Sequence, residues 1–240
     1  MDKVAVYTGS RNLYENMVIA AKSLVANSKV DKIYFFIEDD IFPYKLPDFI
    51  ETKNVSNQTY FDKNGPNMTS QFTYFALMRA ALAFELPEYD TVLSLDVDTI
   101  AVRKCDDVWN LPLDDNYFSA SIEPHRSHNG LVYTNAGVSL FNLKKLRDSG
   151  KAEEVIDILN RHKFSWVDQD VLNYLCQGYI LDMPSEYNAN DYTKPCTRPR
   201  IIHYAGIPHK VWNQREAVGK YRNMSWDDVF IEQHQLEYKS

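Results

Sequence analysis

No apolar stretch in this sequence approaches the roughly 18 residues that a membrane-spanning helix needs, so no membrane span is expected. The chain also lacks internal repeats and low-complexity linkers, and we therefore expect residues 1–240 to form one domain. Its N-terminus leads straight into a strand-like segment without the pattern of a secretory signal peptide. The three cysteines are an odd number and lack metal-type spacing, which indicates reduced thiols and predicts a cytoplasmic protein.

Positive charge is scarce relative to negative charge. The 26 lysines and arginines are outnumbered by 33 aspartates and glutamates, which gives a formal net charge of -7. We therefore expect no binding to nucleic acid, and the acidic stretch at 226–233 argues against a basic tail for membrane surfaces. A phosphorylated ligand stays compatible with this charge because a bound divalent cation can supply the local positive field.

The N-terminal part alternates strand and helix patterns. Residues 4–7 and 33–37 are buried strand candidates, and an apolar face at helical spacing runs from 14 to 25 between them. This order predicts a parallel sheet with a right-handed crossover, whose ligands gather at the carboxyl ends of the strands. The polar residues at the first such end are Thr8, Ser10 and Asn12. They either contact a ligand or only form a turn in which Ser10 or Asn12 caps the helix.

Residues 92–102 form the most informative stretch. This run of strand-forming residues carries two carboxylates, Asp96 and Asp98, with apolar residues on both sides. In an extended chain, residues two apart point to the same side, and buried carboxylates are costly without a compensating cation. The stretch therefore predicts an acidic pair at the end of a central strand, directed at a divalent metal.

A helix is predicted from Phe72 to Leu86, because Pro87 ends the pattern. Arg79 interrupts the apolar stripe of this helix. It either extends to solvent at the helix end or is a buried guanidinium that pairs with the acidic pair or with a ligand. The short spacing to the next strand favours the buried arrangement.

The remaining sequence continues the same alternation. The strand candidates are 117–122, 133–142, 180–181 and 201–203, and the helix candidates are 152–162 and 168–176. Residues 38–70 and 184–200 are predicted to be loops, with one short strand near Val55. Asp168 on its own is explained as an acid capping the last of these helices. Together these elements predict an α/β fold with a mostly parallel central sheet flanked by helices.

Four motifs stand out along the chain: the helix with Arg79 followed by residues 92–98, the Asn135-Ala136-Gly137-Val138 strand, the Asp168-Gln169-Asp170 helix start, and His203 followed by Gly206, Lys210 and Trp212. In order and spacing they resemble the motifs of one family, the family 8 retaining glycosyltransferases. The resemblance spans residues 4–212 and implies a GT-A fold. The chain departs from the family pattern in having Tyr14 displaced by one position, Glu123 where Asp is common, and one extra residue between Gly206 and Lys210.

The resemblance implies a metal-dependent transfer of a hexose, with retention, from UDP-glucose or UDP-galactose to a hydroxyl of a glycan or another acceptor. It implies that Mn²⁺, or alternatively Mg²⁺, is held by Asp96, Asp98 and His203; this set of two carboxylates and one imidazole also suits these ions chemically. The other implied donor contacts are Val97 for the ribose, Gly206 and Lys210 for the phosphates, and Arg79, Glu123, Asn135, Asp168 and Gln169 for the sugar. Asp168 is the candidate nucleophile, with Gln169 assisting, although the resemblance favours attack from the same face of the sugar.

Three alternatives compete with this hypothesis. A haloacid-dehalogenase-type phosphatase also uses a strand followed by Asp-x-Asp, but it has Thr or Val four residues after the first Asp, where this chain has Ile100. A non-catalytic module that binds sugar nucleotides is disfavoured by the complete set of metal ligands. Self-glycosylation on a tyrosine, as in glycogenin, stays open because the chain has 16 tyrosines. The acceptor and the oligomeric state stay open as well.

Overall fold

A computed structural model describes residues 2–69, 73–206 and 212–237 of the chain. Its central sheet has seven strands in the order β3-β2-β1-β4-β7-β6-β8, and a second, two-stranded sheet pairs β5 with β9. The strands are β1 (Val4–Thr8), β2 (Lys32–Ile37), β3 (Ile50–Asn54), β4 (Thr91–Leu95), β5 (Thr99–Ala101), β6 (Phe118–Ile122), β7 (Thr134–Asn142), β8 (Ile180–Asp182) and β9 (Ile201–His203).

The central sheet is mostly parallel, as predicted. Strands β1, β2, β3 and β4 run parallel, and so do β6 and β8. The exception is β7, which is antiparallel to both of its neighbours, β4 and β6. As a result, the start of β7 lies beside the carboxyl end of β4, and both strands deliver side chains to the same edge of the sheet.

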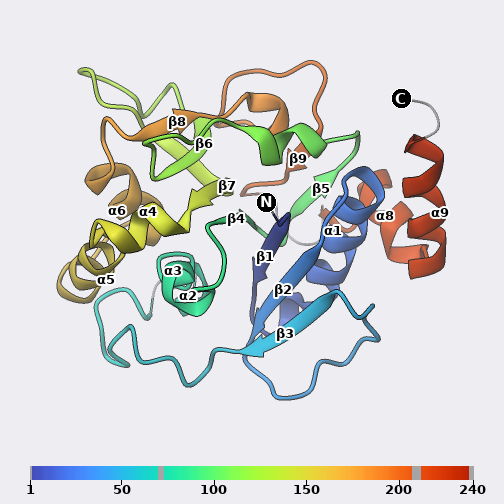
Figure 1. Cartoon of the computed structure of the whole chain (residues 1–240), viewed down its shortest axis with the longest axis horizontal. Helices are drawn as coiled ribbons and strands as arrows, with labels where there is room; N and C mark the ends of the chain where they lie inside the picture. The colour runs from blue at the N-terminus through green and yellow to red at the C-terminus, as the bar shows by residue number, and fades with distance from the viewer. Residues whose placement is uncertain (1, 70–72, 207–211, 238–240) are drawn as a thin grey trace.

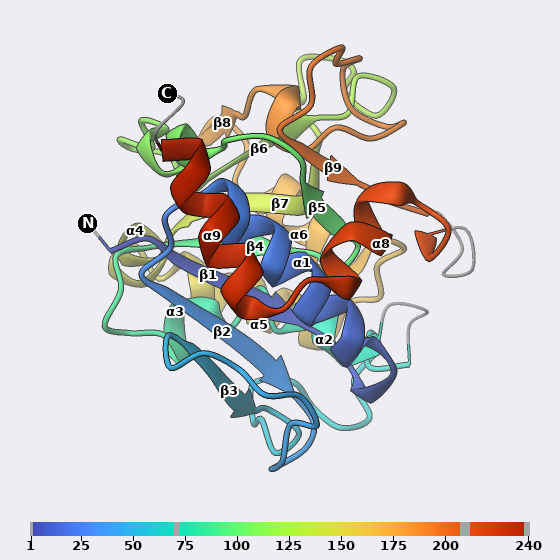
Figure 2. The same cartoon turned by 90° about the vertical axis from the view of Figure 1, so that its right-hand side faces the viewer.

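Helices cover both faces of this sheet (Figure 1). The face on the right in Figure 1 carries α1 (Tyr14–Asn27), α8 (Glu216–Asn223) and α9 (Trp226–Glu237), and Figure 2 shows this helical layer from the front. The opposite face carries α2 (Thr73–Leu77), α3 (Leu82–Glu85), α4 (Leu143–Asp148), α5 (Lys151–Arg161) and α6 (Val167–Leu175). Short 3₁₀ helices are η1 (Arg11–Leu13), η2 (Asp106–Asn110) and η3 (Ser185–Tyr187). In the described part of the chain, no helix has both the length and the apolar character to cross a membrane.

Two apolar cores follow from the alternation of side chains along the strands. In β1, Ala5 and Tyr7 pack into the core under α1, whereas Val4 and Val6 pack into the core under α3 and α6. Residues of the neighbouring strands β2 and β4 contribute to both cores in the same way, so the sheet is buried on both faces. This burial explains why the strands appear in the sequence as nearly continuous apolar runs.

The predicted helix over residues 72–86 is wrong as a continuous element. Within its described part, α2 and α3 are separated by turns whose backbone amides bond three residues back, from Met78 N to Phe75 O through Leu82 N to Arg79 O. No proline or glycine lies between the two helices, so local propensity alone favours a continuous helix. The interruption coincides with Arg79, whose buried ion pairs to distant segments are described below. A tertiary interaction therefore overrides the local preference here.

The predicted extended stretch over residues 92–102 also differs in detail. The chain leaves the central sheet after β4, turns through residues 96–98 and then begins β5. The turn is closed by the Thr99 backbone amide and hydroxyl, which donate to Asp96 O at 3.2 and 2.7 Å. The two carboxylates therefore sit on a turn rather than on one face of an extended strand. Similarly, the short strand expected near Val55 lies just before it, as β3.

Candidate active site

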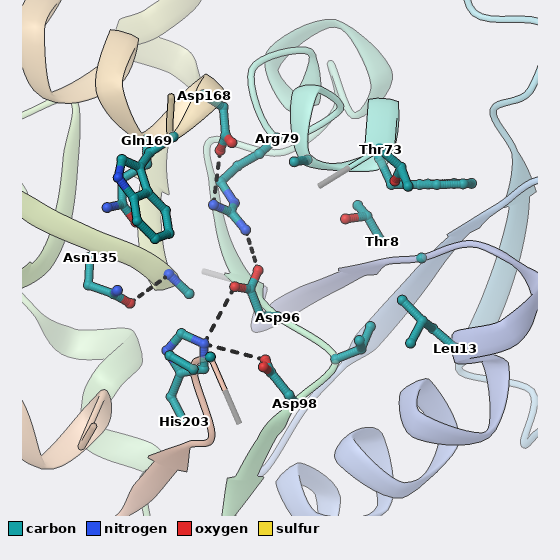
Figure 3. A pocket seen from close by; sticks show the side chains of 18 of the residues that line it. Thr8, Leu13, Thr73, Arg79, Asp96, Asp98, Asn135, Asp168, Gln169 and His203 are labelled. Carbon is teal, nitrogen blue, oxygen red and sulfur yellow. Dashed lines mark hydrogen bonds and ion pairs between the residues drawn. The ribbon is translucent and has the colours of Figure 1, made fainter. Parts of the chain in front are cut away.

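The polar residues that the sequence singles out line one cavity of about 660 Å³ at the carboxyl ends of β1 and β4. The predicted residues that line it are Thr8, Ser10, Asn12, Arg79, Asp96, Val97, Asp98, Glu123, Asn135, Asp168, Gln169, His203 and Gly206. Lys210 lies outside the described residues. Figure 3 shows how the labelled side chains converge from the turn after β4, from β7, α6 and β9, and from the turns after α2.

Asp96, Asp98 and His203 form the centre of this site. His203 Nε2 lies 3.3 Å from Asp98 Oδ1 and 3.6 Å from Asp96 Oδ2 (Figure 3). The antiparallel pairing of β5 and β9 sets Thr99 opposite His203 and therefore brings the histidine next to the turn that carries the acids. In the described parts of the chain, this is the one cluster of three acidic, histidine or cysteine side chains that has the geometry of a metal site.

The donor set fits a divalent cation. Ligand atoms at right angles around an ion with bonds of about 2.0–2.3 Å lie about 3 Å apart, which is close to the distances within this cluster. Gly137 on β7 provides the space for the imidazole, because a Cβ built there would lie 2.0 Å from His203 Cε1. Two oxygens and one nitrogen are ligands that Mn²⁺ accepts well, and they leave further positions for ligand oxygens.

Gly137→Ala is therefore expected to displace His203. We expect Mn²⁺ affinity to fall about 10–100-fold, as it typically does when a residue that positions a metal-binding side chain is mutated. The free energy of unfolding should fall by about 1–3 kcal/mol because the added methyl group overpacks the site. Mn²⁺ titration and urea unfolding measure the two effects. Gly219→Ala in α8 is the matched control, since its added Cβ meets no atom within 4 Å, and it should stabilise the helix by about 0.4–1 kcal/mol with unchanged Mn²⁺ affinity. Unchanged affinity in Gly137→Ala would contradict this account of the glycine.

Charge in the cluster is compensated by the histidine. Burial alone would lower the pKa of His203, but the facing carboxylates of Asp98 and Asp96 raise it above its usual value. Burial alone would likewise raise the pKa of Asp98, and His203 holds that pKa below its usual value. Both shifts favour a protonated imidazole beside ionised acids, so positive charge is favoured at the place where a bound cation would bring it.

Arg79 is buried, with 7% of its side chain exposed, so the alternative in which it extends to solvent is wrong. Its Nη2 pairs with Asp96 Oδ1, and its Nη1 donates to Asp168 Oδ2 at 2.9 Å. The guanidinium therefore links the acidic turn after β4 to the start of α6 (Figure 3). The pKa of Arg79 is raised because these two carboxylates outweigh the effect of burial.

Helix α6 begins in a strained conformation that directs Asp168 toward Arg79. Val167 has φ 43°, a region that β-branched residues rarely adopt and that costs about 1–3 kcal/mol. Asp170 Oδ2 accepts a hydrogen bond at 2.9 Å from the backbone amide of Trp166, which is the N-cap residue of α6. Asp168 is not the N-cap but lies in the first turn of α6, so its position agrees with an acid at the positive helix end, and its ion pair with Arg79 is a further interaction that the helix start does not require.

Asp168 should make stability depend on pH. Burial raises its pKa from 3.8 to about 6, although Arg79 opposes the shift. The folded state then binds more protons than the unfolded state between about pH 4 and 6. Protonation of Asp168 therefore stabilises the folded state; this stabilisation is fully present below pH 4 and is lost as the pH rises through 6. We expect the free energy of unfolding of wild type, relative to Asp168→Asn, to increase by at most about 3 kcal/mol from pH 7 to pH 4 in urea unfolding. A difference that is constant with pH would contradict the raised pKa.

Gln169, Glu123 and Asn135 line the cavity but already have protein partners. Gln169 Oε1 accepts from Ala136 N at 2.9 Å, and its Nε2 donates to Tyr133 Oη at 3.2 Å. Glu123 accepts from Asn135 Nδ2 at 2.8 Å through one oxygen and pairs with Arg126 at 3.2 Å through the other. These side chains are therefore held in fixed orientations.

The turn after β1 borders the end of the cavity away from Gln169, Glu123 and Asn135. Ser10 Oγ donates to Asn12 Oδ1 at 2.6 Å, and neither η1 nor α1 has a side-chain cap, so the helix-capping alternative for these residues is wrong. Tyr14 is buried and donates its hydroxyl to Asp39 Oδ2 at 2.9 Å. The displaced tyrosine thus belongs to the core, and Leu13 lines the cavity instead.

Several lining residues were not anticipated from the sequence. They are Leu13, Asn16, Thr73, Arg126, Trp166 and Tyr192. Asn16 is a buried amide in α1, which also buries Ser23 and Asn27, so no interruption of an apolar face singles it out in the sequence. Arg126 and Trp166 come from distant segments, and the guanidinium lies 4.3 Å from the centre of the indole ring. No local pattern joins two such segments.

Comparison with known proteins identifies relatives of this chain. Residues 5–216 match the family described as "Glycosyl transferase family 8". The glycosyltransferase GlyE of Streptococcus pneumoniae serotype 4 is 27% identical over 256 residues, which cover 94% of this chain and 60% of GlyE. The lipopolysaccharide 1,2-glucosyltransferase of Escherichia coli K12 is 25% identical over 264 residues, which cover 92% of this chain and 78% of that protein. The chain spans 53% of the length of a Haemophilus influenzae relative.

Solved structures agree on the fold. GlyE superposes with a TM-score of 0.73 at 22% identity, covering 98% of this chain and 64% of GlyE. The galactosyltransferase LgtC, solved in complex with donor and acceptor sugar analogs, gives a TM-score of 0.68 at 22% identity, covering 94% of this chain and 99% of LgtC. These likenesses confirm the predicted GT-A architecture.

Proposed function

This chain belongs to glycosyl transferase family 8, and from that premise we propose that it is a metal-dependent retaining hexosyltransferase. Its proposed donor is UDP-glucose or UDP-galactose, and its acceptor is a hydroxyl of a glycan or another molecule. The proposal takes residues 1–240 as one glycosyltransferase domain. It also places the protein in the cytoplasm, which the three free cysteines favour.

The observation that carries this proposal is the convergence of Asp96, Asp98 and His203 in one cavity with the Arg79–Asp168 ion pair. The first three residues would hold Mn²⁺ or Mg²⁺. When bound, such a cation acts as a Lewis acid that stabilises negative charge on the departing diphosphate. The chain has a net charge of -7, and a cation bound at this site would supply the local positive charge that an anionic donor needs.

The remaining predicted residues take the roles that the family resemblance suggests. We assign the nucleotide to Thr8, Ser10 and Asn12, the ribose to the backbone at Val97, and the phosphates to Gly206 and Lys210. The donor sugar is assigned to Arg79, Glu123, Asn135, Asp168 and Gln169. These groups would orient the anomeric carbon toward the open side of the cavity, where the acceptor enters.

For the chemical step, we propose attack by the acceptor hydroxyl on the face that the diphosphate leaves: the new glycosidic bond forms as the bond to the diphosphate breaks, and the hydroxyl proton passes to the departing phosphate oxygen. Asp168 is buried and ion-paired with Arg79 at 2.9 Å, an environment that favours electrostatic support over nucleophilic attack. Its carboxylate would stabilise the positive charge that develops at the anomeric carbon. Gln169, held by Ala136 and Tyr133, would keep the sugar in register.

A thermal-shift screen of nucleotide sugars with Mn²⁺ and with EDTA tests this proposal. The correct donor should stabilise the protein by about 2.7 kcal/mol at a concentration of 100 times its Kd, and only when Mn²⁺ is present. Mn²⁺ with UDP alone and Mn²⁺ with a nucleoside monophosphate separate the contribution of the sugar from that of the phosphates. Equal stabilisation in EDTA would refute metal dependence, and no stabilisation by any nucleotide sugar would refute the proposed donor class.

A further inference from the structure

Asn188 follows η3 in the stretch that the sequence predicted to be a surface loop, yet its side chain is completely buried, with 0% exposed. Its Oδ1 lies 2.9 Å from His203 Nδ1, and its Nδ2 donates to Asn135 Oδ1 at 3.0 Å. Asn135 Nδ2 in turn donates to Glu123 Oε1 at 2.8 Å. Four buried polar side chains therefore form one continuous chain of hydrogen bonds that ends at the imidazole.

The direction of every hydrogen bond in this chain follows from its far end. The Glu123 carboxylate, which also pairs with Arg126, can only accept, so the amide nitrogen of Asn135 must face it. Asn135 Oδ1 then faces the other way and accepts from Gly137 N at 3.1 Å as well as from Asn188. Because the backbone amide of Gly137 can only donate, it independently supports the same orientation.

The same reasoning continues to the histidine. Asn188 presents its nitrogen to Asn135, so its Oδ1 must face His203, where it also accepts from Asn190 Nδ2 at 3.0 Å. An oxygen that only accepts requires a proton on His203 Nδ1. The other ring nitrogen, Nε2, is the one that faces Asp96 and Asp98 at 3.6 and 3.3 Å.

We propose that Asn188 is the positioning residue of the metal site: it keeps the proton of His203 on Nδ1 and so directs the Nε2 lone pair at the cation. This inference rests on the proposed metal dependence. It also gives Glu123 and Asn135 a second task, since they orient Asn188 in addition to bordering the sugar pocket. A partner that fixes the tautomer and ring orientation of a ligating histidine typically contributes 10–100-fold to metal affinity.

Two substitutions separate this role from ordinary packing. Asn188→Leu keeps the approximate size and removes the acceptor for Nδ1. Asn188→Asp keeps an acceptor for Nδ1 but removes the donor to Asn135 Oδ1. If Asn188 acts through His203, Mn²⁺ affinity should fall in Asn188→Leu, which lacks the acceptor for Nδ1, and should be kept in Asn188→Asp, which retains it. The free energy of unfolding should fall in both variants, because each leaves a buried polar group without its partner.

Asn67 provides a matched control. It is a buried asparagine whose Nδ2 donates to Leu159 O and His162 O at 2.6 and 2.7 Å, and whose Oδ1 accepts from Phe164 N at 2.9 Å. Its partners do not line the cavity. Asn67→Leu should therefore destabilise the protein and leave Mn²⁺ binding as in wild type.

The measurement is the Kd of Mn²⁺ alone, without nucleotide sugar, from the electron paramagnetic resonance signal of free Mn²⁺. We expect Asn188→Leu to bind about 10–100-fold more weakly and Asn188→Asp to bind within about fivefold of wild type. Equal affinity of Asn188→Leu and wild type would overturn the role of Asn188, as would an equal loss in Asn188→Asp or in Asn67→Leu. If wild type binds no Mn²⁺, the metal site itself is wrong and this role is lost with it.

A second measurement needs no variant. In wild-type protein loaded with diamagnetic Mg²⁺, ¹⁵N NMR of the histidine rings reports which nitrogen carries the proton. We expect the His203 proton on Nδ1. A proton on Nε2 would overturn the inference even if the variants failed to fold.

Discussion

Arg79→Met is expected to lower the free energy of unfolding by about 3–5 kcal/mol, because it leaves the carboxylates of Asp96 and Asp168 without their shared cation. Asp168 is almost completely buried, so water cannot replace the lost partner. Donor turnover should fall as well, since the two segments that Arg79 joins carry the metal ligands and the sugar pocket. Urea unfolding and donor turnover in the same preparation measure both effects.

Two controls define the origin of this effect. Arg79→Lys keeps the charge, but a single ammonium lacks the planar fork that reaches two carboxylates, so it should recover part of the stability and little of the turnover. Arg147→Met removes an arginine that bonds Ala83 O and Tyr89 O at 3.2 and 3.0 Å on the same side of the sheet. It should cost about 1–3 kcal/mol of stability without a specific loss of turnover. Equal losses in Arg79→Met and Arg147→Met would contradict the special role of Arg79.

Asp98→Asn is expected to reduce donor turnover on the order of 10³-fold. Removing one anionic ligand forfeits several kcal/mol of the charge stabilisation that the cation gives to the leaving diphosphate, and each 1.36 kcal/mol corresponds to a factor of about ten. The fold should persist, because one third of the Asp98 side chain is exposed and the amide occupies the same volume. Initial rates across a Mn²⁺ titration measure the loss.

The matched control for Asp98→Asn is Asp107→Asn. Asp107 is an exposed acid that pairs with Arg200 at 3.0 Å on the surface. Such pairs contribute little, so turnover and Mn²⁺ dependence should stay within about twofold of wild type. Turnover of Asp98→Asn at the wild-type level, with the same dependence on Mn²⁺, would exclude Asp98 as a ligand.

Strand positions were predictable because a strand that is buried on both faces appears in the sequence as a short, nearly continuous apolar run. Strand β9 was predicted at its observed bounds and β1 and β2 within one residue, whereas the single stretch expected over 92–102 is divided into β4 and β5 by a turn. The break between α2 and α3 was not predictable, because its cause is an ion pair between Arg79 and residues 17 and 89 positions away. Local periodicity contains no information about such partners.

The site was predicted as a set of residues but not as a geometry. Asp96 and Asp98 were expected to share one face of an extended strand, whereas a turn closed by Thr99 brings them together. Asn188 was missed because its neighbours are prolines, asparagines and tyrosines, a composition typical of exposed loops. Only the tertiary structure places that loop against β7 and β9, where its amide becomes part of the core.

The most direct test of the central claim is anomalous X-ray scattering from crystals soaked with Mn²⁺ and UDP. The account predicts a manganese peak at about 2.0–2.3 Å from carboxylate oxygens of Asp96 and Asp98 and from Nε2 of His203, with diphosphate oxygens completing the coordination. The peak should disappear in crystals of Asp98→Asn. UDP bound in the cavity with no manganese between these three residues, or with manganese only elsewhere, would contradict the account.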